Sequence, residues 1–392
     1  MSQSDQPTVS IVRCKDVHDA EALLEPVREA FDLIGGLESV IMAGDTVLLK
    51  PNLVSPVNYE NGAVTNPHLV EAVAMLCEKV GARHIVIGDG ACVGASTEEA
   101  FDVTGLRDIA ARHGYELVDF THAPFQYVVN PLAKKMRRIR LPQAFLEANV
   151  VIDLPVMKTH DVLEVSLGVK NMKGLLQTDD KKRFHKWGLV QSVVDLIQIA
   201  KPDITLVDGT IGMEGSGPTW GEPVGLGLLL ASKDVVAADT VAADIMGYTL
   251  DEADYIRQAA MAGVGCCDME QIEVLGLPVD EVRHPFRRSS IDPALLEELG
   301  IELHPMDACS GCANAVQNFL VFLANHDRLE EMRDTILLYG QSVAELPAEA
   351  TEGKRVIRIG SCTRSLIGYG HYFPGCPPFL YPMLKELGLD AE

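Results

Sequence analysis

Four cysteines toward the end of the chain stand in turns rich in glycine, serine and proline: Cys309, Cys312, Cys362 and Cys376. The first two form a C-x-x-C turn, in which Gly311 permits the tight backbone that lets two thiolates reach one metal centre. The other two follow singly. Because four thiolates satisfy a [4Fe–4S] cluster, this set predicts such a cluster as the cofactor.

Two other interpretations of these cysteines stay open. A structural zinc site uses four thiolates too, but zinc ribbons usually supply two close pairs, and this chain has one close pair and two separate cysteines. The other alternative is that they are buried thiols that pack as small apolar side chains, the reading that we adopt for Cys14, Cys77 and Cys92. The adjacent Cys266 and Cys267 follow a helical segment and are left out of the site.

A basic region forms a second candidate site, between residues 157 and 187. It contains seven Lys or Arg and four Asp or Glu, although the chain as a whole has a formal charge of −23. Lys158, Lys170 and Lys173 stand among apolar residues and glycines, where an ammonium group without a partner is unfavourable. They therefore predict a bound small anion. The remaining basic residues are expected to form a solvated face: Lys181, Lys182 and Arg183.

Polar residues also follow several apolar runs of strand length. In an open parallel sheet these positions meet at the carboxyl edge, where ligands bind. The candidate acid–base residues are Lys158, His160, His185 and Glu214. The candidate ligand-binding residues are Lys50, Asn52, Asp89, Lys170, Asn171, Lys173, Gly174 and Asp208. We expect the first two acid–base residues just beyond a strand, and the glycines of segment 208–217 to let the backbone approach a ligand.

The expected fold class is α/β. Strands are predicted at residues 9–13, 46–50, 84–88, 116–120, 149–154 and 204–208, and helices at 18–33, 67–80, 106–113 and 189–200. This alternation indicates an open, mainly parallel sheet with helices on both faces. We expect an α/β domain over residues 1–275. Residues 276–392 are expected to form a C-terminal cluster-binding appendage with short helices at 313–324 and 377–387.

Composition limits the partners. With 392 residues the chain is long for a single core, and its 47% hydrophobic content is that of a globular protein. The first residues do not resemble a signal peptide and no apolar run is long enough to span a membrane, which predicts a cytoplasmic protein. The acidic charge argues against nucleic acid or membrane partners. A small anionic ligand, a redox partner protein and a second copy of the chain are the partners considered.

Several motifs occur in a fixed order: LLKPNL, GDG, PVMKTH, SLGVKNMKGLL, then His185, and VDGTIGMEGSGP. Together they resemble the family called domain of unknown function 362, over roughly residues 47–247. Members are often described as iron–sulfur proteins and many carry a ferredoxin-like segment, so the resemblance implies a cluster. This chain lacks the C-x-x-C-x-x-C-x-x-x-C-P run of those members. Its GCPP turn resembles turns that hold clusters in hydrogenase small subunits.

These features predict an iron–sulfur protein, an oxidoreductase that binds a small anionic substrate or cofactor beside a [4Fe–4S] cluster. A non-enzymatic electron-transfer or cluster-delivery protein is the first alternative. A transferase or hydrolase stabilised by zinc is the second. Colour and metal content distinguish the zinc protein from the other two.

Overall fold

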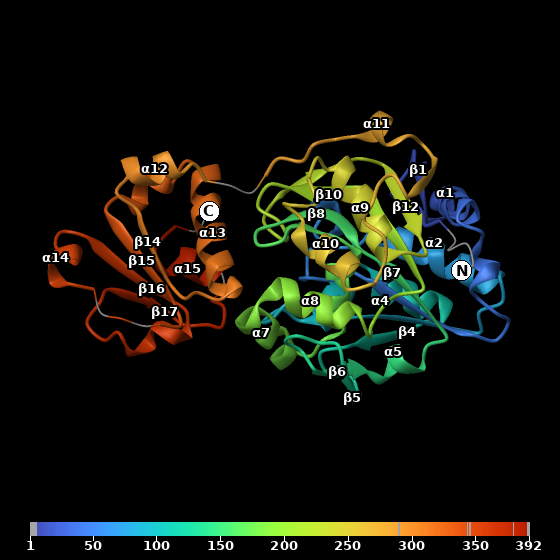
Figure 1. Ribbon diagram of the computed structural model, residues 1–392, viewed down its shortest axis with the longest axis horizontal. Coiled ribbons are helices and arrows are strands. Elements are labelled where there is room, and N and C mark those ends of the chain that lie inside the picture. The colour runs from blue at the N-terminus through green and yellow to red at the C-terminus, as the bar shows by residue number, and fades with distance from the viewer. Residues whose placement is uncertain (1–5, 289–290, 343, 345, 379, 390–392) are drawn as a thin grey trace. The chain divides into compact units, whose positions relative to one another are not determined.

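The computed structural model describes residues 6–288, 291–342, 344, 346–378 and 380–389. It divides the chain into two compact units. Unit 1 comprises Met1–Phe184 and Val190–Arg287, and unit 2 comprises His185–Leu189 and Arg288–Glu392. Each unit has its own sheet, and strands alternate with helices along most of the chain, which confirms the α/β class (Figure 1).

Unit 1 is built on one mixed sheet in the order β13-β1-β12-β10-β7-β2-β3-β4. Its strands are β1 Thr8–Arg13, β2 Thr46–Pro51, β3 His84–Asp89, β4 Glu116–Asp119, β7 Val150–Leu154, β10 Ile204–Glu214, β12 Leu228–Ser232 and β13 Glu273–Gly276. The four strands β7, β2, β3 and β4 run parallel, as do β7 and β10. Strand β12 is antiparallel to both neighbours, so the sheet is only mainly parallel.

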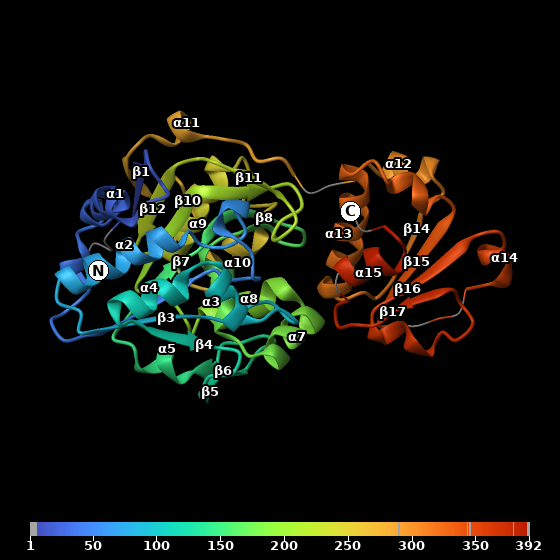
Figure 2. The ribbon, with the colours of Figure 1, turned by 180° about the vertical axis from the view of Figure 1, so that it is seen from behind.

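Helices cover both faces of this sheet. Figure 2 shows α2 Pro67–Lys79, α3 Thr97–Val103 and α4 Leu106–His113 on one face. Together with α1 Ala20–Leu33 they bury one side of the strands in a common core. On the other face, α9 Val235–Ile245 contacts β10 and β12 as well as α6 Gly168–Asn171 and α10 Asp254–Met261. Both faces of the central strands are therefore buried, as their continuous apolar sequences predict.

Two features of unit 1 differ from the sequence predictions. A separate strand, β8 Val156–His160, follows Pro155, so that Lys158 and His160 lie within a strand and not beyond one. Strand β10 does not end at Asp208 but continues to Glu214, pairing with β8 as well as with β11 Glu222–Val224. Strand β9 Glu164–Ser166 pairs with β8 in turn. The glycine-rich segment is therefore largely strand.

The remaining elements of unit 1 lie outside the sheet. Strands β5 Phe125–Val129 and β6 Arg138–Pro142 form a separate antiparallel ribbon. The other helices are α5 Gln143–Glu147, α7 Thr178–Trp187, α8 Leu189–Ile197 and α11 Val279–Val282, of which α7 and α8 extend into the segment grouped with unit 2. Across the described residues, no helix combines the length and apolarity that a membrane crossing requires.

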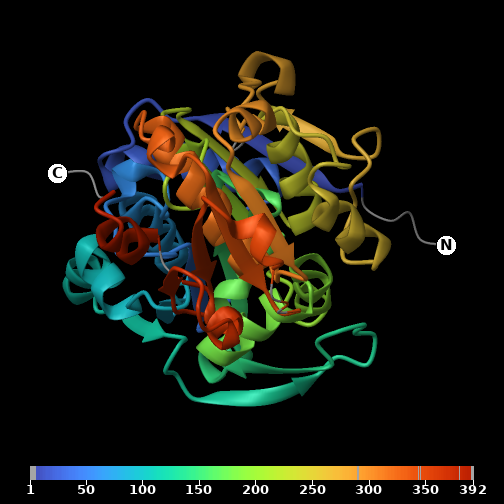
Figure 3. The same cartoon turned by 90° about the vertical axis from the view of Figure 1, so that its left-hand side faces the viewer.

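Unit 2 contains a four-stranded parallel sheet in the order β14-β15-β16-β17, whose strands run side by side in orange to red in Figure 3. Its strands are β14 Glu302–Met306, β15 Thr335–Gly340, β16 Arg355–Ile359 and β17 His371–Phe373. Its helices are α12 Pro293–Glu298, α13 Ser310–Asn325, α14 Ala348–Thr351 and α15 Leu380–Glu386. The sequence prediction of short helices between turns missed this sheet, although TILLYG and RVIRI have the apolar character of buried strands.

Candidate functional site

A chain of buried hydrogen bonds joins three strand ends of unit 1. Lys158 Nζ donates to Asn52 Oδ1 at 3.0 Å, Asn52 Nδ2 to Asn171 Oδ1 at 2.8 Å, and Asn171 Nδ2 to Asp153 Oδ1 at 2.7 Å. The other Asp153 oxygen has no described partner, and burial raises the pKa of this carboxyl to about 7. Three residues predicted from sequence thus meet in one network, and Asp153 joins them.

A second pair lies beside this network. Lys50 Nζ donates to Asp89 Oδ1 at 2.8 Å, and both side chains are buried. The other Asp89 oxygen accepts from the backbone N–H of Leu53 at 2.6 Å. A Cβ atom on Gly174 would lie 1.9 Å from Asp89 Oδ1, so this glycine is required by close packing on the ion pair. Gly174 was predicted to let the backbone approach a ligand. In the structure it lets the backbone approach the Lys50–Asp89 ion pair.

Five lysines interact electrostatically around these groups and form what we call the lysine cluster: Lys50, Lys158, Lys170, Lys173 and Lys181. Burial lowers the pKa of Lys158 and of Lys173 well below the usual range, and the charge of Lys170 lowers both further. Lys158 also donates to the carbonyls of Ala63 and Pro218. A concentration of partly desolvated ammonium groups favours an anionic ligand.

Lys181 corrects a sequence prediction. It was expected on a solvated face, yet it is 3% exposed and donates to the carbonyls of Gly90 and Ala91, both at 2.7 Å. Burial lowers its pKa to about 8. Lys182 and Arg183 are exposed, as predicted. The spacing within α7 explains the difference, because successive helical residues point to different faces.

Lys170 differs from its neighbours. It is 9% exposed, and its ammonium group has no hydrogen bond or ion pair with another described residue. Burial lowers its pKa to about 8, and the Lys50 charge acts in the same direction while Asp161 opposes it. A buried ammonium group without an ion-pair partner is stabilised when a bound anion supplies the opposite charge.

Cys92, in the loop after β3, belongs to the same group. It was expected to be a buried thiol like Cys14 and Cys77, but it is exposed. Protein atoms nevertheless surround it closely, so burial raises the pKa of its thiol, while the charges of Lys181, Lys173 and Lys170 act in the opposite direction. No sequence signal distinguished this cysteine, since the lysines that face it come from segments about 80 residues away.

His160 is a neutral histidine in this environment. Burial lowers its pKa to about 4, an effect that Asp161 opposes and that Lys170 strengthens. Its Nδ1 atom lies 3.0 Å from Asp161 Oδ1 and accepts from the backbone N–H of Val162 at 3.1 Å. In this neutral state the imidazole carries its proton on Nε2 and adds no positive charge to the lysine cluster.

The remaining predicted residues of unit 1 do not join the lysine cluster. Asp208 accepts from Asn66 N at 2.8 Å and from Thr210, and so supports the start of α2. Glu214 accepts from Arg287 N at 2.8 Å. The glycines between them also pack on protein, because a Cβ atom on Gly212 would lie 2.5 Å from the Met157 carbonyl. Their role is to let β10 pass close to β8.

The four cysteines of unit 2, called here the cysteine site, lie at the carboxyl edge of its parallel sheet. Cys309, Cys362 and Cys376 each stand three residues beyond the end of a strand, after β14, β16 and β17 respectively. Cys312 is in the first turn of α13. Although Cys309 and Cys376 are 67 residues apart in the sequence, all four cysteines therefore lie at one edge of one sheet.

Backbone contacts hold these loops together. Ser361 N donates to the Gly375 carbonyl at 2.8 Å, which ties the residue before Cys362 to the residue before Cys376. The Cys309 and Cys312 thiols share a hydrogen bond that lowers the pKa of Cys309 and raises that of Cys312. The charges of Cys362 and Cys376 also raise the pKa of Cys312, so all four thiols lie within electrostatic range.

Space around Cys312 depends on a glycine. A Cβ atom on Gly360, which has a φ of +91°, would lie 2.8 Å from Cys312 Sγ. His185 also groups with unit 2, and its Nδ1 atom lies 3.0 Å from Ser310 Oγ. Among the residues that the structure describes, no three or more His, Cys, Asp or Glu side chains are arranged so that they could hold a single metal ion.

Comparison with known protein families matches residues 47–244 to the family described as domain of unknown function (DUF362). The chain belongs to the DUF362 family. The matched residues include the whole lysine cluster and end before the cysteine site. The residues that match the family therefore lie in unit 1, apart from His185–Leu189.

Relatives of this DUF362 protein include the thylakoid-associated protein sll1697 of Synechocystis sp., which is 31% identical over 66% of this chain and 79% of the relative. Two solved structures are similar at low identity. The lactate racemase apoprotein of Thermoanaerobacterium thermosaccharolyticum is 11% identical with a TM-score of 0.38, over 60% of this chain and 57% of that one. A Thermotoga maritima protein is 10% identical with a TM-score of 0.39, over 90% and 91%.

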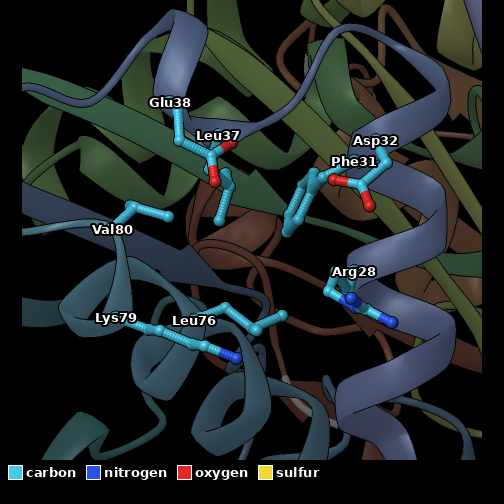
Figure 4. Close-up of a pocket in the computed structure, with 8 residues that line it drawn as sticks. All are labelled: Arg28, Phe31, Asp32, Leu37, Glu38, Leu76, Lys79 and Val80. Atoms are coloured by element: carbon cyan, nitrogen blue, oxygen red, sulfur yellow. The ribbon is translucent and has the colours of Figure 1, made fainter.

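The DUF362 unit also has a pocket of about 490 Å³, lined by residues of α1, of the end of α2 and of the turn at Leu37 and Glu38 (Figure 4). Charged side chains at its rim and apolar ones between them line it: Arg28, Phe31, Asp32, Leu37, Glu38, Leu76, Lys79 and Val80. Figure 4 shows both α1 and the end of α2 contributing to it. No residue predicted from sequence lines this pocket, and we assign no function to it.

Proposed function

We propose that this DUF362 protein is an iron–sulfur protein and a redox enzyme. In this proposal the cysteine site holds a [4Fe–4S] cluster and the lysine cluster binds a small anionic substrate or cofactor. The observation that carries the proposal is the position of the four cysteines at one edge of the unit 2 sheet, three of them in the loops after β14, β16 and β17 and Cys312 in the first turn of α13. Four soft thiolates from separate loops form the donor set that such a cluster requires.

The surroundings of the cysteines fit this cofactor. Cys309 precedes α13, and the backbone N–H groups of Gly311 and Cys312 lower its pKa, which favours the thiolate that a metal needs. Gly360 leaves room beside Cys312. A bound cluster would accept and release single electrons. The four cysteines would hold it, and the tied loops before Cys362 and Cys376 would keep those ligands at a constant separation.

The lysine cluster supports an enzyme over a simple electron carrier. An electron carrier has no use for a buried, partly uncompensated set of ammonium groups, since such a set lowers stability unless an anion binds. His160 lies beside Lys170, and because its Nδ1 accepts from the backbone, its neutral ring would offer Nε2–H as a hydrogen-bond donor to that anion. Zinc bound by the same four thiolates is the alternative for unit 2, and metal analysis separates the two.

The test is metal analysis of protein purified without oxygen. We expect a brown protein that contains iron and acid-labile sulfide. Single Ser substitutions at Cys309, Cys312, Cys362 or Cys376 should lower its iron content, whereas Cys77→Ser should not, because Cys77 is buried in unit 1. Equal iron content in all five variants would contradict the assignment, and zinc without iron would support the alternative.

A further inference from the structure

We propose that strand β5 is an association surface, and that it pairs edge to edge with β5 of a second copy of the chain. Strands β5 and β6 form a two-stranded ribbon, with which no other strand of the described residues pairs. Figures 1 and 2 both show β5 at the outer edge of unit 1. This interface goes beyond the proposed function and uses neither the lysine cluster nor the cysteine site.

The backbone of β5 directs alternate hydrogen-bonding groups toward β6 and away from it. Just beyond the strand, Asn130 N donates to the Arg137 carbonyl at 2.9 Å. Bonded positions recur at every second residue of an antiparallel ladder, so Gln126 and Val128 are the β5 residues that bond to β6. The N–H and C=O groups of the other three residues point to what we call the free edge: Phe125, Tyr127 and Val129.

The free edge of β5 lacks the usual protection of an edge strand. Its three residues are exposed, at 39%, 51% and 55% in chain order, and their outward backbone groups bond to no described residue. Edge strands commonly carry charges or prolines that prevent pairing, and β5 has neither. The outer edge of β6 is different, because Arg140 N donates to Asp180 Oδ2 at 3.4 Å and Pro142 has no N–H.

The rest of the ribbon is fixed to the body of unit 1. Ile139 and Leu141 of β6 are fully buried. In the loop between the strands, Asp195 accepts from the backbone N–H groups of Lys135 and Met136, both at 2.7 Å. The strand that carries the free edge is therefore held in place before a partner arrives, which reduces the ordering that association requires.

A second copy fits this edge best in one register. When two antiparallel β5 strands pair about a two-fold axis at Tyr127, Phe125 of each copy lies opposite Val129 of the other. All outward N–H and C=O groups of both strands then find partners. A shift by two residues would leave one residue of each strand outside the ladder. The edge is thus complementary to itself, as an interface between identical subunits must be.

Charge also favours a second copy. Strand β5 has no charged side chain, so no like charges oppose each other across the axis. Residues 125–142 contain five Lys or Arg and no Asp or Glu, although the whole chain has a formal charge of −23. The protein around each ribbon is therefore strongly acidic, and it complements the basic loop 130–137 of the other copy.

The experiment measures the mass of the full-length protein by size-exclusion chromatography with light scattering over a series of concentrations. We expect wild type to form dimers reversibly. Tyr127→Lys sets two ammonium groups opposite each other on the axis and should raise the dissociation constant of the dimer by about tenfold or more. Met261→Lys is the matched control, because Met261 is 78% exposed on α10, and it should dimerise like wild type.

A mixture of variants tests both the partner and the register. Tyr127→Lys and Tyr127→Glu chains should each be mainly monomeric alone, because like charges meet on the axis. When the two are mixed, opposite charges meet there and the dimer should return. Native mass spectrometry should then show a species with one chain of each kind.

Hydrogen exchange of wild type gives a readout that requires no variant. The amides that point to the free edge should exchange quickly in dilute protein and slowly in concentrated protein: Phe125, Tyr127 and Val129. The amides of Gln126 and Val128 should be protected in both, because they bond to β6.

Three results would overturn the proposal. A wild-type chain that is monomeric at every concentration would leave the free edge to a strand of a different protein. A dimer that Tyr127→Lys does not weaken would have its interface elsewhere. Exchange at the free edge that does not change with concentration would show that the edge stays open in the dimer.

Discussion

The lysine cluster of unit 1 and the cysteine site of unit 2 both lie at the carboxyl ends of parallel strands, but they are held in different ways. In unit 1, side chains hold one another through buried hydrogen bonds and an ion pair. In unit 2, hydrogen bonds from the backbone and hydroxyl of Ser361 tie the loops that precede Cys362 and Cys376, and the Cys309 and Cys312 thiols share a hydrogen bond. A site for a soluble anion must be complete before the ligand arrives, whereas a metal cluster can complete its own site.

The first prediction tests the mutual dependence of charges in unit 1. Asp89→Ala leaves the buried Lys50 without its ion-pair partner and with only the Pro51 carbonyl as an acceptor, and we expect the free energy of unfolding to fall by about 3–5 kcal/mol. Chemical denaturation monitored by circular dichroism measures it. Asp102→Ala, which breaks an exposed ion pair with Arg107, should change it by less than about 1 kcal/mol. Similar losses in the two variants would mean that the unit 1 charges are not held as a network.

The second prediction concerns the pH dependence of Lys170. Its pKa of about 8 in the folded protein lies below the value of about 10.4 for the unfolded chain, so the unfolded state binds more protons between these values. The contribution of Lys170 to stability therefore rises with pH from about 8 to 10.4. Lys170→Met should be more stable than wild type at pH 7, by up to about 3 kcal/mol.

That advantage should disappear as the pH approaches 10.5. Denaturation series at several pH values measure the difference between the two proteins, which removes the contributions of other groups. Lys182→Met serves as the control and should follow wild type throughout. A Lys170→Met protein that is less stable than wild type at pH 7 would indicate that this lysine has a partner in the free protein.

The third prediction concerns unit 2. Gly360→Ala should reduce iron content, because the new methyl group meets Cys312 Sγ, while the backbone conformation of Gly360, with φ +91° and ψ +150°, adds about 1–3 kcal/mol of strain. Gly353→Ala is a matched control, since its φ is +74° and its Cβ atom would meet nothing within 4 Å. Equal iron content in the two variants would show that space beside Cys312 does not limit cluster binding.

Much of unit 1 could be predicted from sequence because its strands are short, continuous apolar runs. Asn52, Lys158 and Asn171 were named as site candidates from sequence, but their hydrogen-bond network was not predicted, because Lys158 lies within β8 and Asn171 in α6 and neither follows the end of a strand. Asp153 and Lys181 were missed, since neither differs in local sequence from a residue in an ordinary strand or an ordinary surface helix. Their roles arise from tertiary contacts with residues far away in the sequence.

The opposite holds in unit 2. There the four cysteines were grouped from their turn sequences and their role as ligands stays a prediction, whereas the sheet that carries them was missed because irregular segments separate its strands. Glu214 shows a third case. A carboxylate after a glycine-rich segment suggested an active-site group, but an extended β10 carries it to Arg287.

The irregular pairing between β8 and β10 has a consequence for how sequence changes are tolerated. Asp208 is opposite Val156 and Met213 is opposite Lys158, so β10 uses three more residues than β8 over this interval. The position of Lys158 along the sheet is thus set by the length of a segment on another strand. Shortening that segment by one residue would slip the register and turn every later side chain of β10 to the opposite face. Segment 209–212 should therefore be constrained in its length as well as at the two glycines that its close packing on neighbouring strands requires.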